Sequence, residues 1–292
     1  MVLDCRCAVL VVSFGSRFPH VRQTSIVPIE CEIAEALPGF VLRRAFTGEI
    51  RHVAEGMRVP TVPQALKELR EEGYRRVLIQ PLFLTRGEEF DQLLTQAAPF
   101  SADGFSLAVG APLLGTAEDC AVLARALLDS LEPPRTDEAL VLMGHGSLHR
   151  SNVEFLRLEQ ALQAAGHRDA FVGVMRGEPG LDRILAAVRQ STHVRTIHLH
   201  PLLMTAGMHA HRDLAGPGDA SWRTRLEAAG YTVRCTLRGL GEYPAVRRLF
   251  VHHAWVAGVR AHFLCAMSGG GYAEAPDGGE IPLSFPNREA PL

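Results

Sequence analysis

The chain contains one pattern twice, and this repeat constrains the fold more than any other feature. Three segments of the first half return in the same order in the second: "SFGS" (13–16) as "GHGS" (144–147), "LIQPLFLTRGEEF" (78–90) as "HLHPLLMTAGMHA" (198–210), and "PLLGTAE" (112–118) as "RGLGEYP" (238–244). Self-similarity in a constant order indicates a duplicated structural unit. The charged, proline-rich stretch "EPPRTDE" (132–138) is the natural joint between the two copies.

Each copy has the pattern of an α/β unit, because short β-branched runs alternate with stretches of helical spacing. Strands are expected at 8–14, 41–46, 76–83 and 105–112 in the first copy and at 139–144, 170–175, 195–203 and 231–237 in the second. Ser151 and Glu154 match a capping box at the start of the helix after the "GHGS" segment.

We therefore predict an α/β fold of two similar doubly wound parallel-sheet halves that face each other across a cleft. The N-terminal half is expected at 1–134 and the C-terminal half at 135–262. Residues 263–292 include the glycine-rich and proline-containing stretch "SGGGYAEAPDGG", which predicts a flexible tail.

Composition excludes several classes of function. A hydrophobic share of 47% in 292 residues supports a sizeable core, and a net charge of −2 lacks the basic footprint of a nucleic-acid-binding protein. Lys67 is the single lysine and there is no GxxxxGK[ST] loop, so P-loop nucleotide chemistry is excluded. No apolar run is long enough for a signal peptide or a membrane span. The six cysteines form no CxxC pair, which indicates reduced thiols and a cytoplasmic protein.

Side chains with chemical potential follow the predicted strands, where functional groups of doubly wound sheets gather. The repeat makes Phe14 equivalent to His145 and Glu89 equivalent to His209. If the halves face each other, His145, His209 and Glu89 converge from separate strands, and such a set suits a divalent transition metal or proton transfer. Two plainer interpretations stay open. His145 could bond a neighbouring loop, and Glu89 could compensate the dipole of a helix.

With these residues assembled, the sequence resembles the class II chelatases, and most closely the anaerobic sirohydrochlorin cobaltochelatases. The resemblance covers roughly residues 8–254. It rests on an ordered series of motifs: "VVSFGS", "RRAFT", "QPLFLTRGEEFD", "MGHGSLHRSN", "FVGVMRGEPGLD", "HPLLMTAGMHAHRDLAG" and "LRGLGEYPAVRRLFVHHA".

The resemblance implies a tetrapyrrole cleft between the halves and a lyase that inserts a divalent metal into sirohydrochlorin without ATP or another nucleotide, in the anaerobic cobalamin pathway. By motif, His145 and His209 match the metal-site histidines of the family and Glu89 its acidic residue, so all three are expected as catalytic and metal-binding groups. The eight carboxylates of sirohydrochlorin suit arginines at the cleft edge. The residues expected to contact the tetrapyrrole are Phe14, Ser16, Arg17, Arg86 and Ser147.

One departure from the family concerns the second strand of the second half. The family commonly has "VEG" there, with a glutamate that can join the metal site, whereas this chain has "MRG" and places Arg176 at that position. Glu178 lies two residues further on. Arginine has no lone pair to offer a metal, so the number of ligands and the choice between Co²⁺ and Fe²⁺ stay open at this point.

The residues leave three functions standing. The first is insertion of Co²⁺, with insertion of Fe²⁺ for sirohaem or haem synthesis as its variant. The second is a carrier of metal or tetrapyrrole that does not turn over. The third is a module that binds another small anionic ligand, since fold alone does not determine function. A homo-oligomer also remains open, and no nucleic acid or membrane is expected as a partner.

Overall fold

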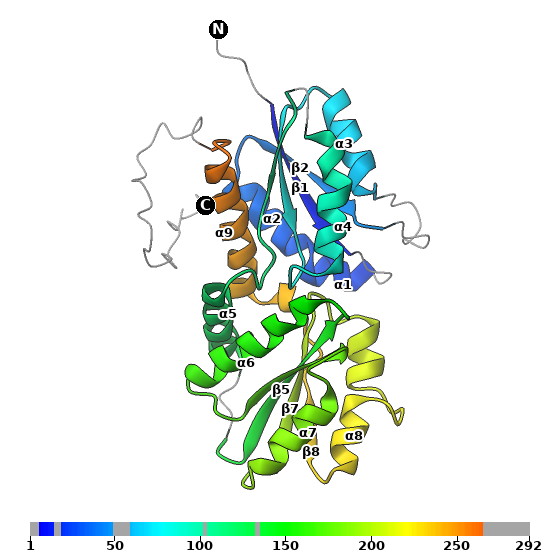
Figure 1. Cartoon of the computed structure of the whole chain (residues 1–292), viewed down its shortest axis with the longest axis vertical. Coiled ribbons are helices and arrows are strands. Elements are labelled where there is room, and N and C mark those ends of the chain that lie inside the picture. Colours follow the sequence, from blue (N-terminus) through cyan, green and yellow to red (C-terminus); the bar gives the residue numbers. More distant parts are fainter. Residues whose placement is uncertain (1–5, 15–18, 49–58, 102–103, 132–134, 265–292) are drawn as a thin grey trace, which may run out of the picture.

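The computed structural model describes residues 6–14, 19–48, 59–101, 104–131 and 135–264, and it shows two four-stranded parallel sheets (Figure 1). The first sheet has the strand order β2-β1-β3-β4, with β1 at Cys7–Ser13, β2 at Phe40–Phe46, β3 at Arg76–Pro81 and β4 at Ser106–Val109. The second has the equivalent order β6-β5-β7-β8, with β5 at Glu138–Gly146, β6 at Ala170–Arg176, β7 at Thr196–Leu202 and β8 at Thr232–Cys235. The predicted fold class and all eight predicted strands are confirmed.

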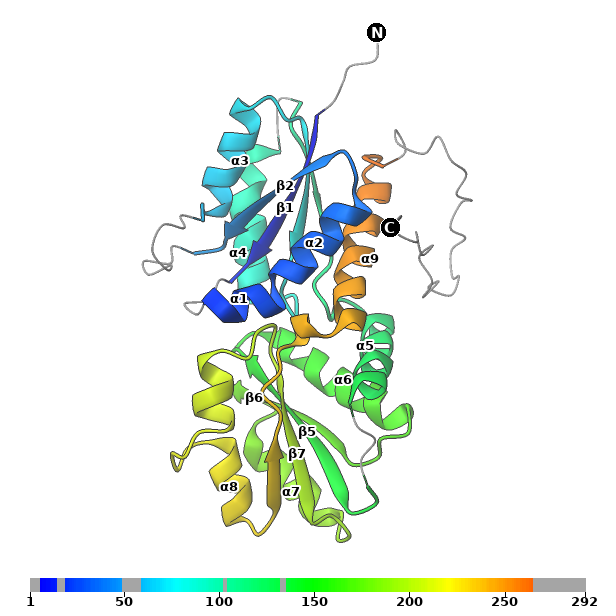
Figure 2. The ribbon, with the colours of Figure 1, turned by 180° about the vertical axis from the view of Figure 1, so that it is seen from behind.

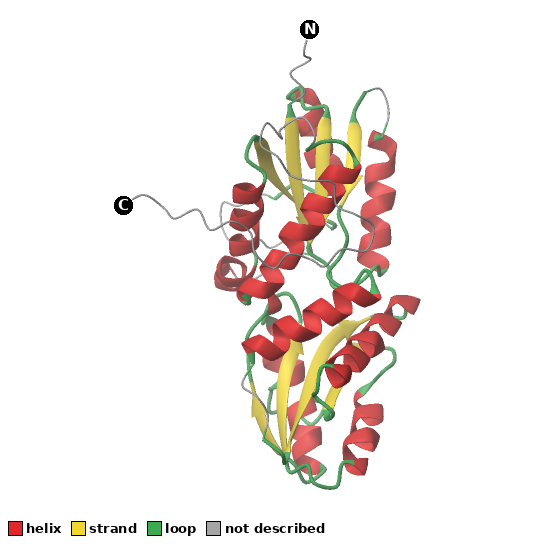
Figure 3. Ribbon diagram, turned by 90° about the vertical axis from the view of Figure 1, so that its left-hand side faces the viewer, coloured by secondary structure: helices red, strands yellow, loops and turns green. Residues whose placement is uncertain are grey.

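Helices cover both faces of each sheet, which explains why the central strands β1 and β5 are apolar without alternation. The first half of the sequence contributes α1 (Pro19–Ser25), α2 (Val27–Ala36), α3 (Val62–Glu71), α4 (Glu88–Ala97) and α5 (Ala117–Ser130). The second half of the sequence contributes α6 (Val153–Ala164), α7 (Leu181–Gln190), α8 (Trp222–Ala228) and α9 (Pro244–Arg260). Figure 3 shows the two sheets one above the other with helices on their flanks. Within the described residues, none of these helices combines the length and apolarity that a membrane crossing needs.

The two halves exchange a helix. Helix α5 follows the last strand of the first sheet, yet it packs against α6 of the second half. Helix α9 follows the last strand of the second sheet, yet it lies beside α2 and covers β3 and β4 of the first sheet (Figure 2). The predicted division at 134/135 therefore follows the sequence repeat, whereas in space α9 belongs to the first sheet.

The exchanged helices share one hydrophobic core with both sheets. That core contains Val9 from β1, Leu142 from β5 and the fully buried Phe250 from α9. Where α5 and α9 meet, Nε2 of His253 lies 2.9 Å from Oδ1 of Asp119. Phe263 and Leu264, the first residues of the predicted tail, are also buried in this core. The rest of the predicted tail, 265–292, lies outside the described residues.

Gln80 and His200 are a repeat pair that shows how the same position is satisfied with different chemistry. Each lies before a strand-end proline and turns its side chain onto the carbonyl of that proline, at 2.9 Å in both halves. Because the Nδ1–H of His200 donates there, its Nε2 accepts the hydroxyl proton of Tyr243 at 2.6 Å. Burial lowers the pKa of His200 to about 4, so the ring is neutral at physiological pH.

Replacing His200 with glutamine, the residue of the first half, is expected to flatten the acid limb of the stability curve. His200 is protonated in the unfolded chain below about pH 6.5 and in the folded chain below about pH 4, so stability falls with decreasing pH through this window. The wild type should lose about 2 kcal/mol more unfolding free energy than H200Q between pH 7.5 and pH 5. Urea titrations at the two pH values measure it, and equal losses in both proteins would contradict the assignment.

Candidate functional site

A cavity of about 470 Å³ lies between the halves, at the carboxyl ends of strands from both sheets. Most of its wall is apolar and comes from segments that are distant in sequence. The apolar residues that line it are Phe14, Ile26, Leu82, Phe83, Leu84, Phe155, Leu202, Leu203, Met204 and Met208. The polar side chains that line it include His145, His209 and Glu89. A large, mainly apolar cavity with a few convergent polar groups is the usual form of a small-molecule site.

His145 stands near the end of β5, where the backbone is tightly packed on two sides. A Cβ on Gly144 would lie 2.6 Å from the ring of Phe155, and one on Gly146 would lie 2.4 Å from the carbonyl oxygen of Arg176 on β6. Gly146 also has a φ of +66°, in the left-handed region that favours glycine. Because these two residues are glycines, the end of β5 that carries His145 fits between α6 and the neighbouring strand β6.

His209 is held by a hydrogen bond to a carboxylate. It follows β7 and stands directly before a single turn of π-helix, Ala210–Leu214. Its Nδ1 lies 2.6 Å from Oδ2 of Asp213, four residues later, and Arg212 binds both oxygens of that carboxylate. Hydrogen bonds from Arg212, together with that from His209, hold the pKa of Asp213 below its ordinary value. An ionised carboxylate therefore lies behind this imidazole at neutral pH.

The two histidines form one pair. Their ring centroids are 5.0 Å apart with an interplanar angle of 72°. In His145 the Nδ1 donates to the carbonyl oxygen of Gly146 at 2.9 Å, just as the Nδ1 of His209 donates to Asp213. With Nδ1 used as the donor in each ring, Nε2 is the atom left to bind a metal, and neither Nε2 has a hydrogen-bond partner among the residues that the structure describes. Two imidazole rings whose centroids lie 5.0 Å apart suit a divalent transition metal.

Glu89 lines the same cavity but stands apart from the pair. It lies in the first turn of α4, after the N-cap residue Gly87. In the part of the chain that the structure describes, no three His, Cys, Asp or Glu side chains come close enough to hold a metal ion together. The geometry thus provides a two-histidine site with a carboxylate elsewhere in the same cavity.

The other predicted contacts divide into three groups. Phe14, which is 68% exposed, and Ser147 line the cavity. Arg86 is not part of the lining; its guanidinium lies over the ring of Phe90, 5.5 Å from the centroid. Ser16 and Arg17 lie outside the described residues.

The departure at the end of β6 leaves that strand without an acidic ligand. Arg176 is exposed and does not line the cavity. Glu178 is also exposed and absent from the lining, and its Oε2 accepts the backbone N–H of Gly180 at 2.8 Å, just before α7. Neither residue supplies a third ligand to the histidine pair.

Asn152 and Asp213 were not predicted as site residues, although Asn152 lines the cavity and Asp213 supports His209. The spacing of Asp213, four residues after a histidine, is the one signal that the sequence offers. Asn152 has no such signal, because two of its three partner residues lie 24 and 26 residues away.

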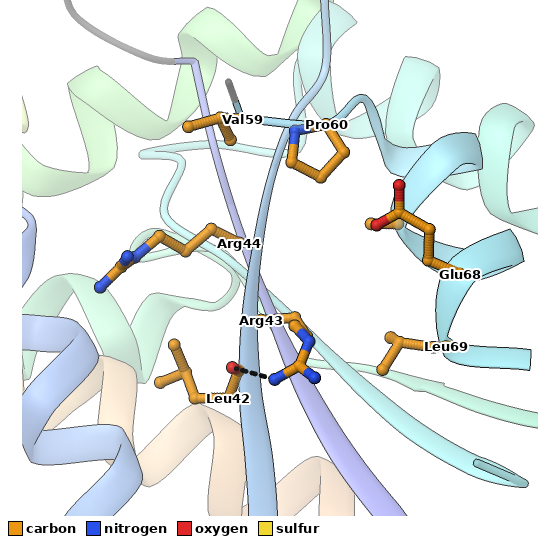
Figure 4. A pocket seen from close by; sticks show the side chains of 8 residues that line it. Leu42, Arg43, Arg44, Val59, Pro60, Glu68 and Leu69 are labelled. Carbon is orange, nitrogen blue, oxygen red and sulfur yellow. Dashed lines mark hydrogen bonds between the residues drawn. The ribbon is translucent and has the colours of Figure 1, made fainter. Parts of the chain in front are cut away.

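A second cavity, of about 290 Å³, lies between β2 and α3 at the edge of the first sheet (Figure 4). Its two arginines are already paired with carboxylates, Arg43 with Glu72 at 3.1 Å and Arg44 with Glu30 at 2.7 Å. None of the predicted site residues lines it. The larger cavity between the halves is therefore the candidate site.

Comparisons with known proteins show which family the chain belongs to. The protein-family model described as cobalt chelatase (CbiK) matches residues 7–257. The sirohydrochlorin cobaltochelatase of Salmonella typhimurium is 34% identical over 250 residues, which cover 84% of this chain and 94% of that protein. The sirohydrochlorin cobaltochelatase CbiKC of Nitratidesulfovibrio vulgaris is 34% identical over 258 residues, which cover 85% and 89%. In fold, the chain is similar to SirB from Bacillus subtilis solved with Fe³⁺, with a TM-score of 0.59, 14% identity and coverage of 88% of this chain and 98% of that one.

Proposed function

Because the chain belongs to the CbiK family of cobalt chelatases, we propose that it inserts Co²⁺ into sirohydrochlorin, as a lyase of the anaerobic cobalamin pathway that needs no nucleotide. The observation that carries the proposal is the pair formed by His145 and His209, which brings two imidazole rings together in one largely apolar cavity. The names of both curated relatives favour cobalt over the iron alternative.

In this proposal Co²⁺ is the substrate metal and the two histidines hold it before transfer. Two imidazole ligands bind more weakly than the three or four protein ligands of permanent metal sites, so the ion can leave for the tetrapyrrole. Neither Arg176 nor Glu178 adds a ligand to the histidine pair, and this small ligand set fits a site that passes its metal on to the tetrapyrrole.

The reaction exchanges one metal ion for two pyrrole protons, so the cavity also needs proton acceptors. As Co²⁺ leaves, the Nε2 of a histidine regains a free lone pair and accepts one of these protons. Glu89, in the same cavity, is the proposed second base and exit for protons toward solvent. Phe14 and the other apolar side chains of the wall pack against the faces of the macrocycle.

The decisive experiment is anaerobic metal insertion followed by visible absorption. Purified protein with sirohydrochlorin and Co²⁺ or Fe²⁺ is compared with a protein-free control, since both metals insert unaided. We expect multiple turnovers with a preference for Co²⁺. A spectral change that stops at one equivalent, with no rate above the control, would instead establish a carrier.

We further propose that the protein works in the cytoplasm. This proposal is supported by Cys31, Cys120 and Cys235, which are thiols in the structure and not members of disulfides.

Replacing Asp213 with asparagine is expected to weaken Co²⁺ binding by about 10- to 100-fold, because it removes the negative charge behind His209 while leaving a hydrogen-bond acceptor. Titration of Co²⁺ without tetrapyrrole, followed by its d–d absorption, measures the change. D169N is the matched control. Asp169 also pairs with a histidine, His193, at 2.9 Å, and neither residue lines the cavity. Equal Co²⁺ affinity in D213N and D169N would show that Asp213 does not support metal binding by His209.

A further inference from the structure

Asn152 occupies a position whose usual role it does not perform. It is the residue directly before α6, where asparagine normally accepts a backbone N–H of its own helix. Its side chain makes no such bond. This also corrects the predicted capping box of Ser151 and Glu154, because α6 begins at Val153 and Oε1 of Glu154 accepts from Arg157 instead. The Asn152 amide is therefore available for something other than its helix, and the residue is 8% exposed and lines the cavity.

The amide of Asn152 joins the loop after β5 to the loop after β6. Its Oδ1 accepts the N–H of Ser147 at 3.1 Å. Its Nδ2 donates to three carbonyl oxygens, those of Ser147 at 2.8 Å, Glu178 at 3.0 Å and Arg176 at 3.2 Å. One buried side chain thus makes four polar contacts with two loops, and the same number of contacts would be lost by its removal.

The two loops are close enough that their relative position has little freedom. Gly177 has a φ of +82°, and a Cβ there would lie 2.3 Å from the carbonyl oxygen of Ser147 and 2.8 Å from Nδ2 of Asn152. Gly146 is paired with Arg176 in the sheet and is equally crowded. The Asn152 amide fills the space between these backbones, so it sets their separation.

One peptide group connects Asn152 to His145. The N–H of Ser147 that donates to Asn152 and the C=O of Gly146 that accepts from Nδ1 of His145 belong to the same peptide unit. That unit is planar, so fixing its N–H direction also fixes the direction of its C=O. The hydrogen bond to Asn152 also polarises the unit and strengthens the acceptor that holds the imidazole.

We propose that Asn152 is the positioning residue of His145, through the peptide group between Gly146 and Ser147. It does for His145 what Asp213 does for His209, with a neutral peptide in place of a carboxylate. The proposal rests on the proposed function, because it assigns a support to one of the two metal-binding histidines.

Co²⁺ affinity measured without tetrapyrrole tests it, in N152A and in the isosteric N152D, which loses the donations from Nδ2. We expect N152A to weaken Co²⁺ binding by about 10- to 100-fold and to raise the KM for Co²⁺, with the KM for sirohydrochlorin within about twofold of the wild type. The control is Q163A, because Gln163 is an amide on the same helix that donates to Ala170 at the other end of β6, at 3.0 Å. Its Co²⁺ affinity should equal that of the wild type. If N152A does not unfold cooperatively, the Co²⁺ affinity of N152D is compared with those of Q163A and the wild type instead.

Double variants separate this role from a general structural one. In an H145A background, N152A should have no further effect on Co²⁺ affinity, whereas in an H209A background it should retain its effect. An equal loss in both backgrounds would overturn the positioning role. If H145A itself leaves Co²⁺ affinity unchanged, the proposed metal site fails, and that result is distinct from the failure of Asn152.

Discussion

Replacing His145 with alanine is expected to lower the turnover number for cobalt insertion by about 100- to 10,000-fold, to the level of the protein-free control. The substitution removes one of the two Nε2 ligands and one of the groups placed to accept a pyrrole proton. The side chain is only half-buried and its one hydrogen bond is local, so the unfolding free energy should change little. Initial rates at saturating Co²⁺ and sirohydrochlorin measure the effect.

The matched control for H145A is H193A. His193 is also a histidine at the surface of the second half with a single hydrogen bond, to Asp169, and it does not line the cavity. Its variant should turn over like the wild type. Full activity in H145A would contradict the assignment of the histidine pair as the metal site. Loss of activity in both H145A and H193A would indicate that the second half is sensitive to any histidine substitution.

Truncating Phe250 to alanine is expected to cost about 3–5 kcal/mol of unfolding free energy, the largest stability change that we predict. Phe250 lies on α9, is 0% exposed, and belongs to the core that contains strands of both sheets. Removing its ring leaves a cavity that neither sheet can close alone. Urea denaturation followed by far-UV circular dichroism measures the loss, which is a large fraction of the stability of a typical domain.

W255A on the same helix is the control, because Trp255 is an aromatic residue that remains 37% exposed. It should cost about 1 kcal/mol or less. Similar losses in F250A and W255A would show that α9 is not anchored in the shared core. Circular dichroism and fluorescence should also report a single transition in the wild type, since the two sheets share that core.

The positions of the strands in the sequence were predictable because local patterns determine them. The runs around Val9 and Leu142 are continuous and apolar, as strands covered on both faces must be, and the repeat relates them to each other. The exchange of α5 and α9 was not predictable. Amphipathic spacing shows which face of a helix is buried but not which of two similar sheets it meets.

The candidate site shows the same division. His145 and His209 were identified because the repeat placed them at strand ends, and the structure brings their rings to 5.0 Å. Arg86 was expected to line the cleft because it follows a strand-end motif, yet its guanidinium lies over Phe90 outside the lining. Asn152 was missed because its bonds reach carbonyls of another loop, and a backbone carbonyl carries no residue signature in the sequence.

The helix exchange has a consequence for synthesis on the ribosome. The four strands of the first sheet are complete when Val109 has been made, but α9, which covers one of its faces, ends at Arg260. About 150 residues separate these points, and at roughly 5–20 residues per second the gap lasts on the order of 10–30 seconds. During that time α2 lies on this face of the nascent first sheet without α9 beside it, so the part over β3 and β4 that α9 covers stays exposed. The first half therefore cannot complete its packing before the second half has been made, and we expect its uncovered apolar strands to be prone to aggregation until then.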